Sequence, residues 1–200
     1  MGYSKADKLE SHERIVKVAA DLFRELGVNG ISVADLMQYA GLTHGGFYRH
    51  FSSREELVDE AVERALKDGS AVADSIAAAP QSNIGSVVDA YLSLAHRDNI
   101  ASSCAVTAMA SDVARSGDRA RAAYTRQVGR YVELISKLIE HQPPKKRRAH
   151  ALESLATLVG ALSMARAVND DKLSKEILKT AADALKARLA AAAPAGGRHA

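Results

Sequence analysis

The placement of the prolines constrains the fold of this chain more than any other feature of its sequence. The four prolines are Pro80, Pro143, Pro144 and Pro194. A proline inside a helix costs about 3 kcal/mol or more, so helices are expected to stop at these points. The stretches 1–79, 81–142 and 145–193 between them repeat apolar residues every three or four positions and contain few alternating β-branched runs. This period predicts an all-α protein.

Glycines and capping residues divide these stretches into about nine helices. Ser11 and Ser32 are expected N-caps, Gly27 and Gly41 are expected C-terminal stops, and Ser53-Arg54-Glu55-Glu56 is a predicted capping box. The expected helices span about 10–26, 32–40, 43–50, 54–78, 84–97, 102–115, 118–141, 146–168 and 172–192. We predict a DNA-binding domain over 1–53, a ligand-binding and dimerisation domain over 54–193 and a disordered tail over 194–200.

Composition narrows the class of protein. Hydrophobic residues make up 47 % of the 200 residues and charged residues 26 %, which is typical of a globular protein. The longest mostly apolar stretch, 155–167, is too short to span a bilayer, and the N-terminus has no apolar signal core. The single cysteine, Cys104, excludes an internal disulfide framework. We expect a cytoplasmic protein with no membrane partner.

Residues 32–50 have the dimensions of a helix-turn-helix, whose second helix places its first residues against base edges in the major groove. That second helix contains Gly45-Gly46, and each glycine costs roughly 1 kcal/mol relative to alanine. A surface that approaches DNA closely would gain from them. The donors around them are Thr43, His44, Tyr48, Arg49 and His50. Arg54 opposes the dipole of the next helix unless a phosphate lies beside it. The alternative is a small surface helix with a solvated polar face.

Three segments together resemble the signature of TetR-type transcriptional regulators. They are Ile31-Ser32-Val33, Ala40-Gly41-Leu42-Thr43 and Gly45-Gly46-Phe47-Tyr48-Arg49-His50-Phe51-Ser52-Ser53-Arg54-Glu55-Glu56-Leu57. The resemblance covers about residues 10–58 and implies an all-α homodimer that binds double-stranded DNA at a palindromic operator. By position, the implied phosphate contacts are Ser32, Tyr48, His50 and Arg54. The residues implied at or near base edges are Thr43, His44, Gly45, Gly46 and Arg49. Phe47 and Phe51 are expected in the core.

The same resemblance implies that a small-molecule inducer binds in the larger domain and moves the long fourth helix. Candidate ligand contacts are Tyr91, His96, Cys104, Met109, Tyr124 and Tyr131. For each of these residues ordinary core packing is the alternative. Cys104 is expected in the first turn of its helix, where the dipole lowers the pKa of a thiol. It is either a sensing thiol, as in an electrophile-responsive subset of the family, or an inert buried cysteine.

Dimerisation is predicted on the last two helices, at about 146–168 and 172–192. Residues 149–168 are apolar nearly all round, so one face can meet the protein core and the other a partner subunit. Two helices from each subunit would form a four-helix interface. The alternative is the core of a monomer.

Other functional classes leave little trace in the sequence. It contains no G-x-S-x-G, G-x-G-x-x-G, P-loop or H-E-x-x-H motif, and its seven histidines are scattered. We therefore predict no enzyme activity, no catalytic residues, no metal site and no cofactor. The remaining alternative is a helical small-molecule-binding or adaptor protein without DNA binding.

Overall fold

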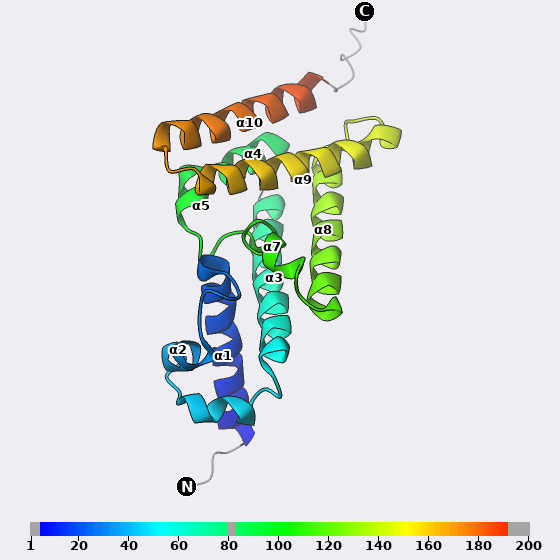
Figure 1. The fold of residues 1–200 in the computed structure, drawn as a ribbon. Helices are drawn as coiled ribbons and strands as arrows, with labels where there is room; N and C mark the ends of the chain where they lie inside the picture. Colours follow the sequence, from blue (N-terminus) through cyan, green and yellow to red (C-terminus); the bar gives the residue numbers. More distant parts are fainter. Residues whose placement is uncertain (1–4, 80–82, 192–200) are drawn as a thin grey trace, which may run out of the picture. The chain divides into compact units, whose positions relative to one another are not determined.

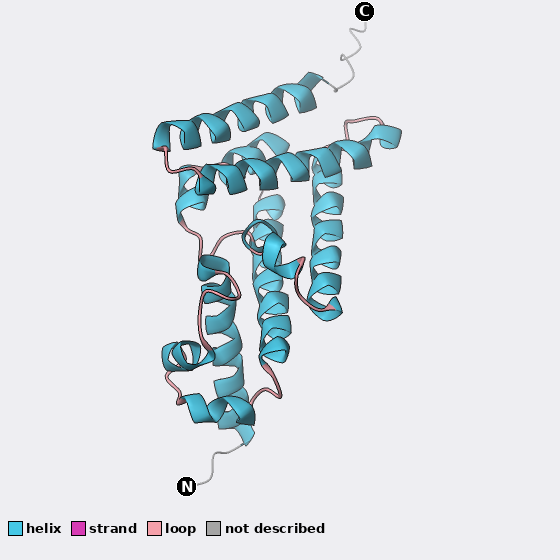
Figure 2. Ribbon diagram, in the orientation of Figure 1, coloured by secondary structure: helices cyan, strands magenta, loops and turns pink. Residues whose placement is uncertain are grey.

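A computed structural model describes residues 5–79 and 83–191 of the chain. Helices account for all regular structure in this part, which contains no strand (Figure 2). The segments are α1 (Lys5–Leu26), α2 (Val33–Tyr39), the 3₁₀ helix η1 (His44–Arg49), α3 (Arg54–Ala78), α4 (Ile84–Tyr91), α5 (Leu94–Asp98), α6 (Ala105–Ala108), α7 (Ala110–Val113), α8 (Asp118–Leu138), α9 (Pro144–Ala167) and α10 (Asp171–Ala191) (Figure 1). The predicted all-α class is confirmed, and the predicted tail over 194–200 lies outside the described residues.

The described residues form eleven helical segments instead of about nine, because two expected helices are each broken. The expected helix 84–97 already ends at Tyr91, and Ser93 caps a new helix by accepting a hydrogen bond from the backbone N–H of His96 at 3.1 Å. The expected helix 102–115 is broken at Met109, which separates α6 from α7. Neither break contains a proline or glycine, so spacing alone did not reveal it.

Two expected caps are also corrected. Ser11 is a buried residue inside α1. The helix begins earlier, at Lys5, because residues 5–10 are mostly good helix formers and Asp7 lies in the first turn. At the start of α3, Ser53 Oγ accepts from the Glu56 N–H at 3.2 Å, as a capping box requires. The Glu56 carboxylate, however, accepts from the backbone N–H of Ser52 at 2.6 Å, one residue earlier than predicted.

Packing divides the described chain into two compact units. Unit 1 contains the chain up to Ala71 together with Ile100–Gln127, and unit 2 contains Val72–Asn99 together with the chain from Val128 onward. The helices α3 and α8 therefore each contribute residues to both units. The functional division at residue 53 remains a prediction, because packing groups 54–71 and 100–127 with the N-terminal helices.

A buried arginine holds unit 1 together near the end of α1. Arg24 is 6 % exposed, and its Nε donates to the carbonyl of Ala101 at 2.5 Å. Its Nη1 donates to the Ala65 carbonyl at 3.4 Å, and its Nη2 pairs with Asp21 at 2.5 Å. Since a buried charge is costly unless fully paired, these bonds fix α1 against α3 and against the segment that begins at Ile100.

Unit 2 is built on the antiparallel pair α9 and α10, which run side by side (Figure 1). Their core includes Leu158 and Leu162 from α9 and Leu178 and Leu185 from α10, packed with Val88 of α4. Arg166 of α9 donates to the carbonyls of His96 and Arg97 at 2.5 and 3.0 Å. These bonds satisfy carbonyls near the end of α5 and hold that short helix on α9.

Candidate nucleic-acid interface

The turn between α2 and η1 is set by a glycine in the left-handed region. Gly41 has φ +72°, which side chains rarely adopt. Its N–H donates to the Gln38 carbonyl at 2.9 Å, and the Leu42 N–H donates to the Met37 carbonyl at 2.8 Å. These two bonds form a Schellman motif, which closes α2 and redirects the chain into the next helix. The predicted stop at Gly41 is confirmed.

We call residues 43–50 the recognition segment. It consists of the 3₁₀ helix η1 with Thr43 and His50 as its capping residues. The backbone N–H of Gly46 donates to the Thr43 carbonyl at 2.9 Å, while the Thr43 side chain makes no capping hydrogen bond. Thr43 therefore occupies the N-cap position without capping the segment through its side chain. Its hydroxyl is left on the exposed side of the segment, where it is available to a partner.

The fold itself does not require the two glycines of this segment. A Cβ added at Gly45 would meet no described atom within 4 Å. At Gly46 it would meet Met37 Cε at 3.6 Å and Thr43 Oγ1 at 3.8 Å, which are ordinary contacts. Neither glycine has a positive φ. Their helix-weakening cost therefore has no compensation in the packing of this chain.

Buried and exposed rings alternate along the recognition segment. Phe47 and Phe51 are each 2 % exposed and stack at a centroid distance of 5.4 Å, which confirms their predicted place in the core. Tyr48 packs the edge of its ring on Phe47 at 5.2 Å but remains 74 % exposed. His44 and Arg49 are also exposed. The segment is thus anchored by two rings and presents hydroxyl, imidazole and guanidinium groups outward.

His50 lies at the edge of this core, beside a histidine that the sequence analysis missed. Its ring centroid is 6.0 Å from that of His12, whose own ring stacks on Phe51 at 4.6 Å. The Nε2 atom of His12 lies 2.7 Å from a carboxylate oxygen of Glu60. Burial, and then the neighbouring charges of His12, Lys8 and Arg49, lower the pKa of His50. The only signal for His12 was its spacing from Ile15 and Ala19 on the buried face of α1.

Ser32 and Arg54 flank the helix-turn-helix, and each has an internal partner. Ser32 Oγ accepts from the Asp35 N–H at 3.1 Å, which confirms the N-cap, and donates to the Asp35 carboxylate at 2.6 Å. Arg54 Nη2 donates to the carbonyls of Val28 and Ile31 at 2.5 and 3.1 Å. Arg54 therefore supports the loop before α2. Its expected phosphate contact remains a prediction for the rest of the guanidinium.

The six candidate ligand contacts are divided equally between the two units. In unit 2, Tyr91 and His96 pack edge to face at 4.8 Å, and His96 Nδ1 lies 2.7 Å from the Tyr91 carbonyl oxygen. Burial lowers the pKa of His96, and the Arg166 charge adds to this effect, while the hydrogen bond to the Tyr91 carbonyl opposes it. Tyr131 is buried in the same unit.

The other three candidates belong to unit 1. Cys104 is 8 % exposed and stands at the N-cap of α6, one position before the first turn in which it was expected. Met109 is fully buried. The hydroxyl of Tyr124 donates to the Val106 carbonyl at 2.8 Å, and burial raises the pKa of that phenol. Core packing thus accounts for the burial of Cys104 and Met109 and for the hydrogen bond of Tyr124.

Two further features are absent from residues 5–79 and 83–191. No group of three or more histidine, cysteine or acidic side chains is placed to hold a metal ion there. No helix in that part of the chain combines the length and the apolar character needed to cross a membrane.

Comparison with known proteins agrees with this geometry. Residues 15–61 match the family model described as bacterial regulatory proteins of the tetR family. The HTH-type transcriptional repressor KstR2 of Rhodococcus jostii is 39 % identical over 54 residues, which are 27 % of this chain and 26 % of that repressor. The Mycobacterium tuberculosis protein Rv0196, an uncharacterised HTH-type transcriptional regulator, is 26 % identical over 166 residues, covering 79 % of this chain and 85 % of the relative.

Solved structures show the same fold over most of the chain. The reduced form of NemR from E. coli superposes with a TM-score of 0.73 at 19 % identity, covering 89 % of this chain and 96 % of NemR. A TetR transcriptional regulator from Chloroflexus aurantiacus gives a TM-score of 0.74 at 24 % identity, covering 90 % and 96 % of the two chains. At such identities the likeness concerns the arrangement of helices alone.

Proposed function

We propose that this chain is a DNA-binding transcriptional regulator of the TetR type and not an enzyme, as its similarity to such regulators supports. We further propose that it is a cytoplasmic, ligand-responsive repressor. In this proposal a homodimer binds a palindromic operator and is released by a small-molecule or thiol-reactive inducer. The observation that carries the DNA-binding part is the recognition segment, which exposes Tyr48, Arg49 and His44 while Phe47 and Phe51 anchor it.

The contacts with DNA follow from this exposure. Thr43, His44, Gly45, Gly46 and Arg49 would meet base edges, and Ser32, Tyr48, His50 and Arg54 would bind phosphates. Gly45 and Gly46, which the packing does not require, would allow the backbone to approach the bases. Arg49 is the one exposed cation within the segment and could bind a guanine through two parallel hydrogen bonds.

The homodimer is supported by apolar side chains that α9 and α10 leave exposed. Leu152 and Met164 on α9 are 44 % and 58 % exposed, and Leu173 on α10 is 43 % exposed. Ala156 and Ala167 extend the same exposed stripe of α9. A second copy of this pair of helices would cover these residues in a four-helix interface, as the all-round apolar character of α9 predicts.

Induction would require a ligand that binds the released conformation better than the DNA-bound one. A change of a few ångströms in the separation of two recognition segments would spoil their match to half-sites about 34–36 Å apart. The burial of Cys104 supports an inert cysteine over a sensing thiol, so a small-molecule inducer is the simpler form of the proposal.

A mobility-shift assay with the DNA upstream of the chain's own gene tests the proposal. We expect a complex that survives excess non-specific DNA, with an affinity that falls steeply as salt rises because phosphate contacts release counterions. Footprinting should protect two half-sites centred about one helical turn, or a multiple of it, apart. Absence of any protected sequence in this DNA and in genomic fragments would favour a helical adaptor without DNA binding.

A further inference from the structure

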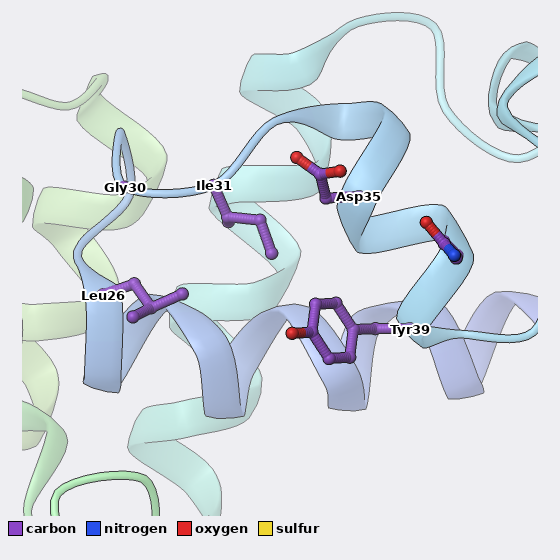
Figure 3. A pocket seen from close by; sticks show the side chains of 6 residues that line it. Leu26, Gly30, Ile31, Asp35 and Tyr39 are labelled. Carbon is purple, nitrogen blue, oxygen red and sulfur yellow. The ribbon is translucent and has the colours of Figure 1, made fainter.

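A groove on unit 1 has no assigned role. It lies between the end of α1, the loop that follows and the outer face of α2, and its volume is about 550 Å³ (Figure 3). We call it the α1–α2 groove. Its lining residues are Leu26, Gly30, Ile31, Asp35, Gln38 and Tyr39. None of them belongs to the proposed DNA contacts or to the candidate inducer contacts.

Two large apolar side chains of this groove remain open to solvent. Leu26 is 49 % exposed and Tyr39 is 68 % exposed, although both stand beside a well-packed core. Figure 3 shows the Tyr39 ring and the Leu26 side chain on either side of Ile31, which is itself buried and forms the floor between them. An apolar floor with an aromatic wall is the usual lining of a small-molecule site.

The polar lining of the groove is anionic. Asp35 is exposed on α2, and its carboxylate accepts a hydrogen bond from Ser32 Oγ at 2.6 Å. Among residues 5–79 and 83–191, no lysine, arginine or histidine forms an ion pair with Asp35. The carboxylate stands at the rim of an apolar surface, where it would attract a cation.

We propose that the α1–α2 groove binds a small organic cation, an ammonium group carried on an aromatic or aliphatic body. The ammonium would pair with the Asp35 carboxylate and lie against the face of the Tyr39 ring, which attracts cations through its quadrupole. The body would cover Leu26 and Ile31. The Gln38 amide adds a hydrogen-bonding group at the rim. A volume of about 550 Å³ is within the range of small-molecule sites.

Titration of the ¹⁵N-labelled full chain with phenethylammonium chloride, without DNA, tests this site by NMR. We expect saturable shifts of the backbone amides of Gly30, Ile31, Asp35 and Tyr39, with a dissociation constant on the order of 1 mM for so small a probe. The neutral analogue 2-phenylethanol should bind about fivefold more weakly, the factor expected for one partly exposed ion pair. Equal binding of the two probes would overturn the proposal.

Two variants locate the interaction. Asp35→Asn keeps the backbone N–H that Ser32 caps and should weaken phenethylammonium binding about fivefold. Glu55→Gln removes a matched exposed carboxylate, in the first turn of α3, and should leave binding unchanged. Tyr39→Ala, at an exposed position, should weaken binding of the cation more than that of the alcohol. If Asp35→Asn were misfolded by circular dichroism, the Tyr39→Ala comparison would decide. Unchanged binding in the folded variants, or shifts confined to other residues, would refute the site whatever the outcome of the DNA experiment.

Discussion

Two short helical segments of unit 1 use their side chains in opposite ways. Phe47 within the recognition segment and Phe51 directly after it are buried and hold a 3₁₀ turn whose remaining side chains are mostly exposed. In α6 and α7, each four residues long, Val106 and Val113 are buried, and so are the flanking residues Cys104 and Met109. The recognition segment exposes most of its polar side chains to solvent, whereas α6 and α7 bury their valine side chains in the core. Short helices of similar size are therefore distinguished by burial and not by residue type.

The largest effect is expected where the recognition segment is anchored. Phe47→Ala should lower the free energy of unfolding by about 3–5 kcal/mol, because it removes a fully buried ring and leaves a cavity beside Phe51. Urea unfolding followed by circular dichroism measures this loss. In the neighbouring variant Tyr48→Ala the exposed ring is lost, and unfolding should change by less than about 0.5 kcal/mol. Similar losses in both variants would mean that the two rings are not divided between core and surface.

The anchoring of this segment was predictable from sequence because its signals are local. Gly41 stops α2, Ser32 caps it, and Phe47 and Phe51 are spaced one helical turn apart. Each of these features acts within a few residues, so the printed sequence contains the whole argument. The partners of Arg24 could not be found in this way, because Ala65 and Ala101 are backbone acceptors that any residue could supply.

The burial of Cys104 beside α6 should protect its thiol from reagents in solution. Cys104, 8 % exposed, should react with a maleimide about 100-fold more slowly in the native protein than in urea, because reaction requires local opening. Mass spectrometry of quenched samples measures the rate. Cys104→Ser provides the blank, and operator binding by that variant should match the wild type before and after treatment. Rapid native labelling, together with loss of operator binding in the wild type alone, would restore the sensing thiol.

The next effect is a loss of DNA affinity with little change in the stability of the fold. Tyr48→Ala should weaken operator binding about tenfold, since it removes one exposed hydroxyl and ring from a proposed phosphate contact. Fluorescence anisotropy with labelled operator DNA at fixed salt gives the dissociation constant. Tyr39→Phe, which alters an exposed tyrosine on α2 outside the proposed interface, is the matched control and should bind as the wild type does. Equal affinity of Tyr48→Ala and wild type would remove Tyr48 from the interface.

The predicted inducer contacts show why an interior site is hard to predict from sequence. Tyr91, His96 and Tyr131 lie in unit 2, whereas Cys104, Met109 and Tyr124 lie in unit 1. A cavity is assembled from residues far apart in the chain, and periodicity identifies only which residues face inward. An inward-facing tyrosine or methionine gives the same sequence pattern whether it packs on a neighbour or lines a pocket. The sequence therefore predicted the short recognition segment, where contiguous residues suffice, whereas both the DNA contacts and the inducer contacts stay predictions.

The smallest expected effect is a pH dependence from the edge of the recognition segment. Burial and the charges of His12, Lys8 and Arg49 lower the pKa of His50 in the free protein, whereas a phosphate beside the ring would raise it in the complex. DNA binding then takes up a proton, so operator affinity should rise on the order of two- to threefold as the pH falls from 7.5 to 6. The stability of the folded protein changes in the opposite sense. Because the pKa of His50 is lowered in the folded state, its contribution to the free energy of unfolding is complete above the unfolded-state pKa and is lost as the pH falls below it. Anisotropy titrations should show a flatter pH profile for His50→Gln, while His141→Gln in unit 2 keeps the wild-type slope. A slope that is unchanged in His50→Gln would place the phosphate elsewhere and leave His50 as part of the core.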